Sequence, residues 1–496
     1  MIRFILRRTL STAVVLLVVT LVLFLLLDTA LDYYADLRQS TAPNIGALYE
    51  ARARLLDLDT PAIIRYFQWL TGAAGCLVGS CDLGTAWVSG QPVTDQLQGA
   101  VVNTVKLVTG ATLVSILVGV FLGMISALRQ YTGFDYFITF VSFLLYSLPV
   151  FWVAVLLKQY GAIEFNNFLS DPVVGWVPII VVSVAAGLIW MGALGGTGRR
   201  RLLAFGGATL VTFGTIYYVL ASGWLYDPTF GIVGIGVFSL ATAVAVTFLS
   251  TGLSNRRALW TALTVAVIGI GLYMPLQNLF WYVEMNWLWM FLLALVAVGV
   301  GLAVGAAFRG PDPLVSGRTG AITAIVIGVL IFIDRVFQEW GRYGDHPAIN
   351  QRPIATIGAS TPNLTGDFWF VNLDSFTHLL LPSIALVLIS IASYTRYTRG
   401  SMLEVMNQDY IRTAKAKGLP GRTVVMRHAL RNALLPLASI IPVDIITMIG
   451  GAVITETIFG WSGMGKLFID SMNRNELDPI MAYIVITGLL AVVANL

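Results

Sequence analysis

Long apolar runs separated by short polar stretches set the pattern of this chain of 496 residues. Most runs hold about 20 residues, the length that an α-helix needs to cross the hydrocarbon core of a bilayer. The pattern therefore predicts twelve membrane-spanning helices. They are expected at 10–27, 101–128, 137–157, 178–195, 202–222, 231–251, 258–281, 287–307, 320–337, in a run that opens with 379–391, at 437–458, and in a last run that begins near Pro479.

The composition supports this interpretation. Hydrophobic residues make up 57% of the chain and charged residues only 11%, which is typical of an integral membrane protein. The net charge of +4 comes from basic residues gathered between the apolar runs. That distribution indicates membrane topology and not a nucleic-acid surface, so membrane lipid is an expected partner and nucleic acid is not.

The basic residues between the runs also predict orientation. Arg3, Arg7 and Arg8 precede the first run, which places the N-terminus in the cytoplasm. In the middle of the chain, arginines mark every second junction, at 199–201, at 256–257 and at 309 with 318, whereas the junctions near Asp227 and Glu284 lack Lys and Arg. The six middle runs should therefore leave the outside and return to it, so that the spans after them keep their orientation.

The two cysteines of the chain, Cys76 and Cys81, lie in the polar stretch 31–99 after the first run. An oxidising exterior permits a disulfide between them, and two free thiols fit the sequence equally well. His346, His378 and His428 are scattered along the chain. Neither residue type therefore predicts a metal site.

The longest basic and polar stretch, 395–436, interrupts the apolar pattern late in the chain. A helix over 404–417 would carry one apolar stripe on an otherwise polar surface. Gly418 suits a C-cap, Pro420 prevents continuation, and a second short helix over 422–434 leads to the next run. The stretch predicts a helix–turn–helix elbow at a membrane face, although an ordinary basic cytoplasmic loop has the same composition. The stripe consists of Met402, Met406, Tyr410 and Ala414.

The letters DYIRTAKAKGL followed by RHALRNALLP resemble the cytoplasmic coupling segment of ABC-importer permeases, in the form of the dipeptide, oligopeptide and nickel permease family. The general pattern of Glu-Ala-Ala, three residues and Gly falls on 412–414 and Gly418, and 435–436 supplies the closing Leu-Pro. The resemblance implies that the elbow sits in a cleft of a separate ATPase subunit. The residues that it implies in this coupling are Glu404, Tyr410, Ile411, Arg412, Thr413, Ala414, Lys415, Ala416, Lys417, Gly418 and Leu419.

The resemblance covers 1–157 and 378–496, where DLGTAWVSGQPV and NTVKLV lead into the second span and HLLLPSIAL opens the fourth. It implies an all-α polytopic membrane protein with the six-span core of a type I ABC importer permease. The expected divisions are a first span (1–30), an extracytoplasmic domain (31–99), core spans two and three (100–157), an insertion (158–377), core span four (378–398), the coupling elbow (399–436) and core spans five and six (437–496).

The insertion 158–377 departs from this family, since about six additional spans replace one outside loop. No resemblance explains its role, and we expect a bundle packed beside the core. A self-contained secondary transporter with twelve spans is the alternative function. Such transporters usually show two six-span halves as internal repeats, and the sequence shows no such repeat.

Asp444 and Glu456 lie in or beside the fifth core span, where ionisable groups are candidates for a translocation path because their desolvation is costly. Helix geometry separates them by about 18 Å, so they should not pair. A structural role is an equal alternative for Glu456. The run 460–467 nearly spells a phosphate-binding loop, but Leu467 replaces the hydroxyl residue and the run follows an apolar helix, so no ATP site is predicted. The candidates for the translocation path are Asp444, Glu456, Phe459, Gly463 and Gly465.

The resemblance also implies partners. A second homologous permease subunit would complete the pore, and an extracytoplasmic binding protein would deliver the substrate. Two ATP-binding subunits would drive transport, with ATP and Mg bound to them and not to this chain. The chain itself would bind no cofactor and would not be an enzyme. It would lie in the plasma membrane of a prokaryote. The sequence leaves open whether a dipeptide, an oligopeptide, nickel or a sugar is moved, and whether the natural chain continues beyond Leu496.

Overall fold

The computed structural model describes residues 2–39, 44–76, 78–308 and 313–495. Among these residues ten helices are long and apolar enough to cross a membrane, or up to eleven when one sharply bent helix pair counts as a span. A shorter apolar helix over Leu477–Val492 accounts for the last predicted run. Eleven of the twelve predicted runs thus coincide with one helix each, the third falls on a bent pair of helices, and the all-α polytopic fold is confirmed.

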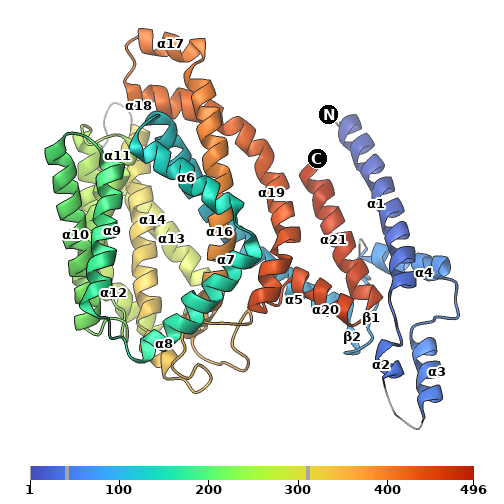
Figure 1. The fold of residues 1–496 in the computed structure, drawn as a ribbon. Coiled ribbons are helices and arrows are strands. Elements are labelled where there is room, and N and C mark those ends of the chain that lie inside the picture. The colour runs from blue at the N-terminus through green and yellow to red at the C-terminus, as the bar shows by residue number, and fades with distance from the viewer. Residues whose placement is uncertain (1, 40–43, 77, 309–312, 496) are drawn as a thin grey trace.

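The N-terminal part holds the small polar domain after the first span, at the end of the molecule away from α17 (Figure 1). Its elements are α1 (Ile2–Ala30), α2 (Ala35–Arg38), α3 (Ile45–Leu55), α4 (Ala62–Gly75), β1 (Thr85–Ala86) and β2 (Gln91–Pro92). The two strands are antiparallel, with Thr85 opposite Pro92. Cys76 and Cys81 form a disulfide that closes the loop after α4. Of the two alternatives, a disulfide or two free thiols, the structure has the disulfide.

Helix α5 (Val93–Leu128) packs along α16 (Phe368–Met406) at the centre of the core. A Cβ atom added at Gly119 would lie 2.6 Å from Cβ of Tyr394, and one at Gly123 would lie 2.6 Å from the carbonyl oxygen of Thr395. The two glycines therefore permit the close approach of these helices. Helix α5 begins inside the stretch 31–99 that the sequence assigns to the polar domain.

The third predicted run, 137–157, is not one straight helix. Helix α6 (Gly133–Ser147) and a second helical arm from Val150 to Ser170 meet at an angle of 99°. Pro149 disfavours helical geometry in the residue before it, and Leu148 is extended, with φ −79° and ψ 129°. The second arm consists of α7 (Val150–Leu156), the π-helix η1 (Leu157–Glu164) and α8 (Phe165–Ser170).

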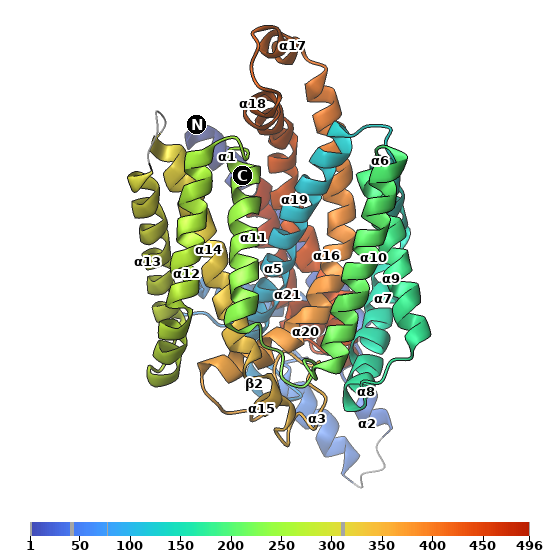
Figure 2. The ribbon, with the colours of Figure 1, turned by 90° about the vertical axis from the view of Figure 1, so that its left-hand side faces the viewer.

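The insertion forms two units on the side of the core opposite to α1 (Figures 1 and 2). The hairpin of α9 (Trp176–Leu194) and α10 (Gly198–Ala221) contacts α6. The group of α11 (Gly231–Ser250), α12 (Arg256–Tyr282), α13 (Trp287–Ala307) and α14 (Pro313–Phe337) shares one hydrophobic core with the start of α16, where Tyr273, Ile327 and Trp369 are buried together. The insertion thus packs beside the core, as a lateral bundle.

The basic junctions that the structure describes lie at the end of the molecule that carries α17. Arg129, in the turn between α5 and α6, donates to the carbonyl oxygen of Ala193 at 3.2 Å, so the α9–α10 junction lies beside that turn. Arg257, after the α11–α12 junction, lines one cavity with Arg422 of the elbow. At the other end, the backbone N–H at the start of α11 donates to Asp334 near the end of α14 at 2.6 Å. The insertion therefore leaves one side and returns to it.

The chain closes with α19 (Leu430–Phe459), α20 (Met464–Asn473) and α21 (Leu477–Asn495). Helix α21 returns to α1, where Phe24, Trp69 and Met481 are buried in one cluster. The elbow between α16 and α19 contains α17 (Asp409–Ala416), α18 (Gly421–Thr423) and the π-helix η2 (Val424–Ala429).

Candidate functional site

The elbow projects beyond the ends of the spans, with α17 at the tip (Figures 1 and 2). The prediction of one continuous helix over 404–417 is wrong, because α16 ends at Met406 and a new helix begins at Asp409. The N–H groups of Asn407 and Gln408 close the last turn of α16 through bonds to Glu404 and Val405 at 3.2 and 3.1 Å. Gln408 then turns extended, with ψ 150°, and redirects the chain.

A small apolar cluster fastens α17 to the neighbouring helices. Ile411 is 0% exposed and Ala414 is 6% exposed, and both pack with Met402 of α16 and with Val424 of η2. The predicted stripe is thus correct for Met402 and Ala414, whereas Tyr410 is 43% exposed. The break before α17 rotates Ile411 inward in its place, so the elbow is held by packing on both of its sides.

Gly418 ends α17 in the conformation that the sequence predicts. Its φ is +71°, in the left-handed region that glycine adopts without strain. The N–H of Gly418 donates to the carbonyl of Lys415 at 3.0 Å, and the N–H of Leu419 donates to that of Ala414 at 3.4 Å. These two bonds form a Schellman motif, which fixes where the helix stops and how the chain leaves it.

The remaining residues that the resemblance implies in coupling face outward. The ion pair of Arg412 with Asp409 on α17 is weak, since the two groups are 3.6 Å apart and largely exposed. The elbow therefore presents a basic surface above a buried anchor. The exposed residues are Glu404, Arg412, Thr413, Lys415, Ala416, Lys417 and Leu419.

An ion pair that the sequence did not indicate ties the base of the elbow to the core. Arg399 of α16 donates from Nε and Nη2 to the two carboxylate oxygens of Asp135 at 2.8 and 2.9 Å. Ser126 of α5 and the backbone N–H of Tyr131 also donate to Asp135, which is 2% exposed. Thr132 and Asp135 have the spacing of a helix start, but the sequence cannot show a partner 264 residues away.

Glu456 lies at the end of α19, and its carboxylate accepts three hydrogen bonds. Its carboxylate accepts from the Thr104 hydroxyl at 2.6 Å and from the backbone N–H groups of Gly465 and Lys466 at 2.7 and 3.0 Å. The side chain is 0% exposed. These hydrogen bonds join α5, α19 and α20. They fit a structural role for Glu456, the alternative to a place in the translocation path.

The glycines beside Glu456 permit this arrangement. A Cβ atom at Gly463 would overlap the Glu456 carboxylate, and one at Gly465 would lie 2.5 Å from Cα of Val453. The N–H groups at Gly465 and Lys466, which a phosphate would need in a phosphate-binding loop, already bind the carboxylate. In this structure the two N–H groups are therefore engaged within the chain.

The candidates for the translocation path do not form one site. Glu456, Gly463 and Gly465 lie together, and Phe459 is buried beside them against Ala154 and Leu381 in a separate cluster. Asp444 lies three turns earlier in α19 and is half-buried. The prediction that Asp444 and Glu456 do not pair agrees with their places in one continuous helix.

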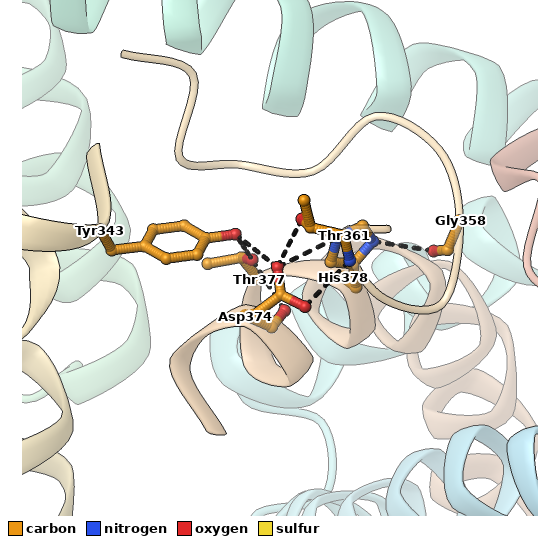
Figure 3. Close-up of polar contacts among 6 residues, drawn as sticks. All are labelled: Tyr343, Gly358, Thr361, Asp374, Thr377 and His378. Atoms are coloured by element: carbon orange, nitrogen blue, oxygen red, sulfur yellow. Dashed lines mark hydrogen bonds and ion pairs between the residues drawn. The ribbon is translucent and has the colours of Figure 1, made fainter. Parts of the chain in front are cut away.

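A second polar cluster fastens the loop between α14 and α16 to α16 (Figure 3). Asp374 accepts from the Thr361 hydroxyl at 2.6 Å and from the hydroxyl of Tyr343 in α15 (Trp340–Gly344) at 2.9 Å, and it lies 3.4 Å from His378. His378 Nδ1 bonds the carbonyl oxygen of Gly358 at 2.9 Å. Burial raises the pKa of the Tyr343 hydroxyl above its ordinary value, so it stays a donor. Sequence reasoning missed this cluster because its members look unrelated along the chain.

Comparison with known families supports the resemblance at both ends of the chain. A family model described as "Binding-protein-dependent transport system inner membrane component" matches residues 350–496. A second, described as "Binding-prot-dependent transport system membrane comp, N-term", matches residues 1–108. Together they cover about half of the chain, on either side of the inserted helices.

Several curated relatives match part of the chain. The oligopeptide transport system permease protein AppB of Bacillus subtilis (strain 168) is 50% identical over 123 residues, 25% of this chain and 39% of that protein. The dipeptide transport system permease protein DppB of Escherichia coli (strain K12) is 42% identical over 124 residues, 25% of this chain and 37% of that protein. The oligopeptide transport system permease protein OppB of Mycobacterium tuberculosis (strain ATCC 25618 / H37Rv) is 38% identical over 208 residues, 39% of this chain and 64% of that protein.

The chain thus matches between 37% and 64% of the length of these relatives. The fold described above, with spans at both ends and a projecting elbow between α16 and α19, fits what they share by name, a transport system permease protein. The chain belongs to the family of binding-protein-dependent transport system inner membrane components, the permeases of ABC importers, with a six-helix insertion between its two matched parts.

Proposed function

We propose that this chain is a pore-forming permease subunit of an ABC importer, driven by separate ATP-binding subunits through its elbow. The observation that carries the proposal is the geometry of α17, a basic helix that projects beyond the spans on a buried anchor at Ile411. Membership of the family supports it. The exposed residues of α17 would contact a cleft in the ATP-binding subunit, while Ile411 and Ala414 hold the helix to this chain.

The connections of the elbow suggest how motion would reach the pore. One arm of the elbow continues into α16, which packs along α5, and the other continues into α19, which packs on α20 and α21. The ion pair of Arg399 with Asp135 joins the base of the first arm to α6. Displacement of α17 would therefore move both halves of the core. Closure of the ATP-binding subunits could favour either the inward-facing or the outward-facing state of the pore, because the closed subunits would bind that state better.

Peptides are the proposed solute class. The relatives are named as permeases of oligopeptide and dipeptide transport systems, and each matches about a quarter of this chain. A second permease subunit would complete the pore, an extracytoplasmic binding protein would deliver the peptide, and ATP with Mg would bind to the partner subunits. The proposed setting is the plasma membrane of a prokaryote with the elbow, the basic junctions and the N-terminus on the cytoplasmic side.

A photo-crosslinking amino acid at position 413 tests the role of α17. Thr413 is exposed on α17, and Arg200 is exposed at the α9–α10 junction on the same side of the molecule, which makes it a matched control. In the assembled complex we expect an adduct with an ATP-binding subunit from position 413 and none from position 200. Adducts from both positions, or from neither, would contradict the assignment of the elbow as the contact.

A further inference from the structure

A polar cavity lies between the insertion and the elbow. Its volume is about 520 Å³, and it is bounded by the α11–α12 junction, the first turn of α14, and the segment from α18 into η2. The insertion thus contacts the part of the chain that follows α17. Its polar lining includes Arg257, Arg422, Arg427, Thr251, Thr423 and Ser316.

The described lining of this cavity is basic. Three arginines line it, and the described lining residues include no carboxylate. Among the residues that the structure describes, no salt bridge involves Arg422 or Arg427. Guanidinium groups present several N–H donors in a planar fork that matches phosphate oxygens, and the hydroxyls of Thr251 and Thr423 add smaller donors.

The backbone of the α11–α12 junction seats one of these arginines. Gly252 has φ +84°, and a Cβ atom at this position would lie 2.9 Å from Nη1 of Arg422. The guanidinium of Arg422 therefore rests on the junction, and this side chain is half-buried. A side chain on residue 252 would displace it, so the turn and the arginine fit each other.

Exposed apolar side chains on the segments that line the cavity favour a lipid over a soluble anion. Leu253, Leu314 and Met426 are 47%, 79% and 42% exposed, at the same end of the spans as the cavity. Basic pockets between membrane helices on the cytoplasmic side are suited to anionic headgroups, whose acyl chains can lie on neighbouring apolar surface.

We propose that this cavity binds the phosphate of an anionic phospholipid headgroup and thereby links the inserted helices to the coupling elbow. The headgroup phosphate lies among Arg257, Arg422 and Arg427, which come from two segments separated by about 165 positions in the sequence. The bound lipid bridges the insertion and η2, so the inserted helices make the position of the elbow sensitive to membrane composition. Neutralising two of the arginines should weaken lipid binding by about thirtyfold, from the usual contribution of each arginine near an anionic headgroup.

Lipid binding to the purified full chain in neutral detergent tests this proposal. The probes are phosphatidylglycerol and inorganic phosphate, and the readouts are lipid retained in native mass spectrometry and the shift of the thermal unfolding midpoint. The site variant carries Arg422→Gln with Arg427→Gln. The control variant carries Arg199→Gln with Arg201→Gln, which removes the same charge from another junction on the same side.

Loss of phosphatidylglycerol binding in the site variant alone supports the proposal, and partial recovery with Arg422→Lys and Arg427→Lys shows that the protein still folds. Equal loss in the site and control variants would indicate general attraction to a basic surface and would overturn it. An equal effect of inorganic phosphate and phosphatidylglycerol on the wild type would assign the cavity to a soluble anion and would overturn the proposal of a bound lipid. Unchanged binding in the site variant would overturn it as well.

Discussion

Gly418→Val is the sharpest perturbation of the elbow. Gly418 holds φ +71° at the end of α17, and a Cβ atom there would meet nothing within 4 Å. The cost of the valine is therefore backbone strain and not a steric clash with a neighbour. A left-handed conformation costs an L-residue roughly 1–2 kcal/mol, and a β-branched residue lies at the upper end.

This strain is large compared with what holds the end of α17. The two N–H bonds of the Schellman motif, to Lys415 and Ala414, would be lost when the residue leaves this conformation. A cost of one or two kcal/mol changes the ratio of the two states by a factor of about 5–30. We therefore expect the apparent affinity of the elbow for the ATP-binding subunit to fall by up to that factor, while the spans still form.

The assay is substrate-stimulated ATP turnover of the assembled complex, measured beside the amount of chain in the membrane. Gly421→Val is the matched control, because Gly421 lies three residues away, has no left-handed φ and has nothing within 4 Å of its Cβ position. Gly418→Asn should be intermediate, since asparagine tolerates this conformation. Normal stimulated turnover in Gly418→Val, or an equal defect in Gly421→Val, would refute the reasoning.

Three further predictions concern two charged residues and the orientation of the insertion. Lys415→Glu should reduce co-purification of the ATP-binding subunits in detergent, where no anionic lipid competes; unchanged recovery would mean that the basic face of α17 contacts headgroups instead. Asp135→Ala leaves the half-buried guanidinium of Arg399 without its two bonds, so thermal unfolding should report a loss of about 2–3 kcal/mol, and a stability within error of the wild type would contradict the account. With the native cysteines replaced, a cysteine at position 227 should react with an impermeant thiol reagent on intact cells and one at position 200 should not; Asp227 and Arg200 are both exposed in the structure, so labelling at 200 would break the predicted orientation.

The spans could be predicted because the bilayer imposes their length and leaves the backbone no alternative to a helix. The end of α17 could be predicted because Gly418 and Pro420 are local signals. The break at Asn407 could not, since no glycine or proline lies there and the packing of Ile411 decides it. The bend at 148–149 had a local signal, the proline itself, but the continuous apolar run 137–157 led to the prediction of one straight span.

The contacts of the candidate site were beyond the sequence for a different reason. Glu456 stood out as an ionisable group beside a span, but its role depends on Thr104, which lies 352 residues earlier. The same holds for Asp374, whose partners come from α15 and from the loop that precedes α16. A single sequence shows which polar groups are costly to bury, and only the fold shows what satisfies them.

Transport by reconstituted proteoliposomes tests the central claim most directly. The complete complex, with its partner permease, its ATP-binding subunits and its binding protein, is supplied with a labelled dipeptide and a labelled oligopeptide. The account predicts import that requires hydrolysable ATP on the side of the elbow and that is absent when the ATP-binding subunits are omitted. Import by this chain alone, driven by an ion gradient and indifferent to ATP, would contradict it and would favour a self-contained secondary transporter.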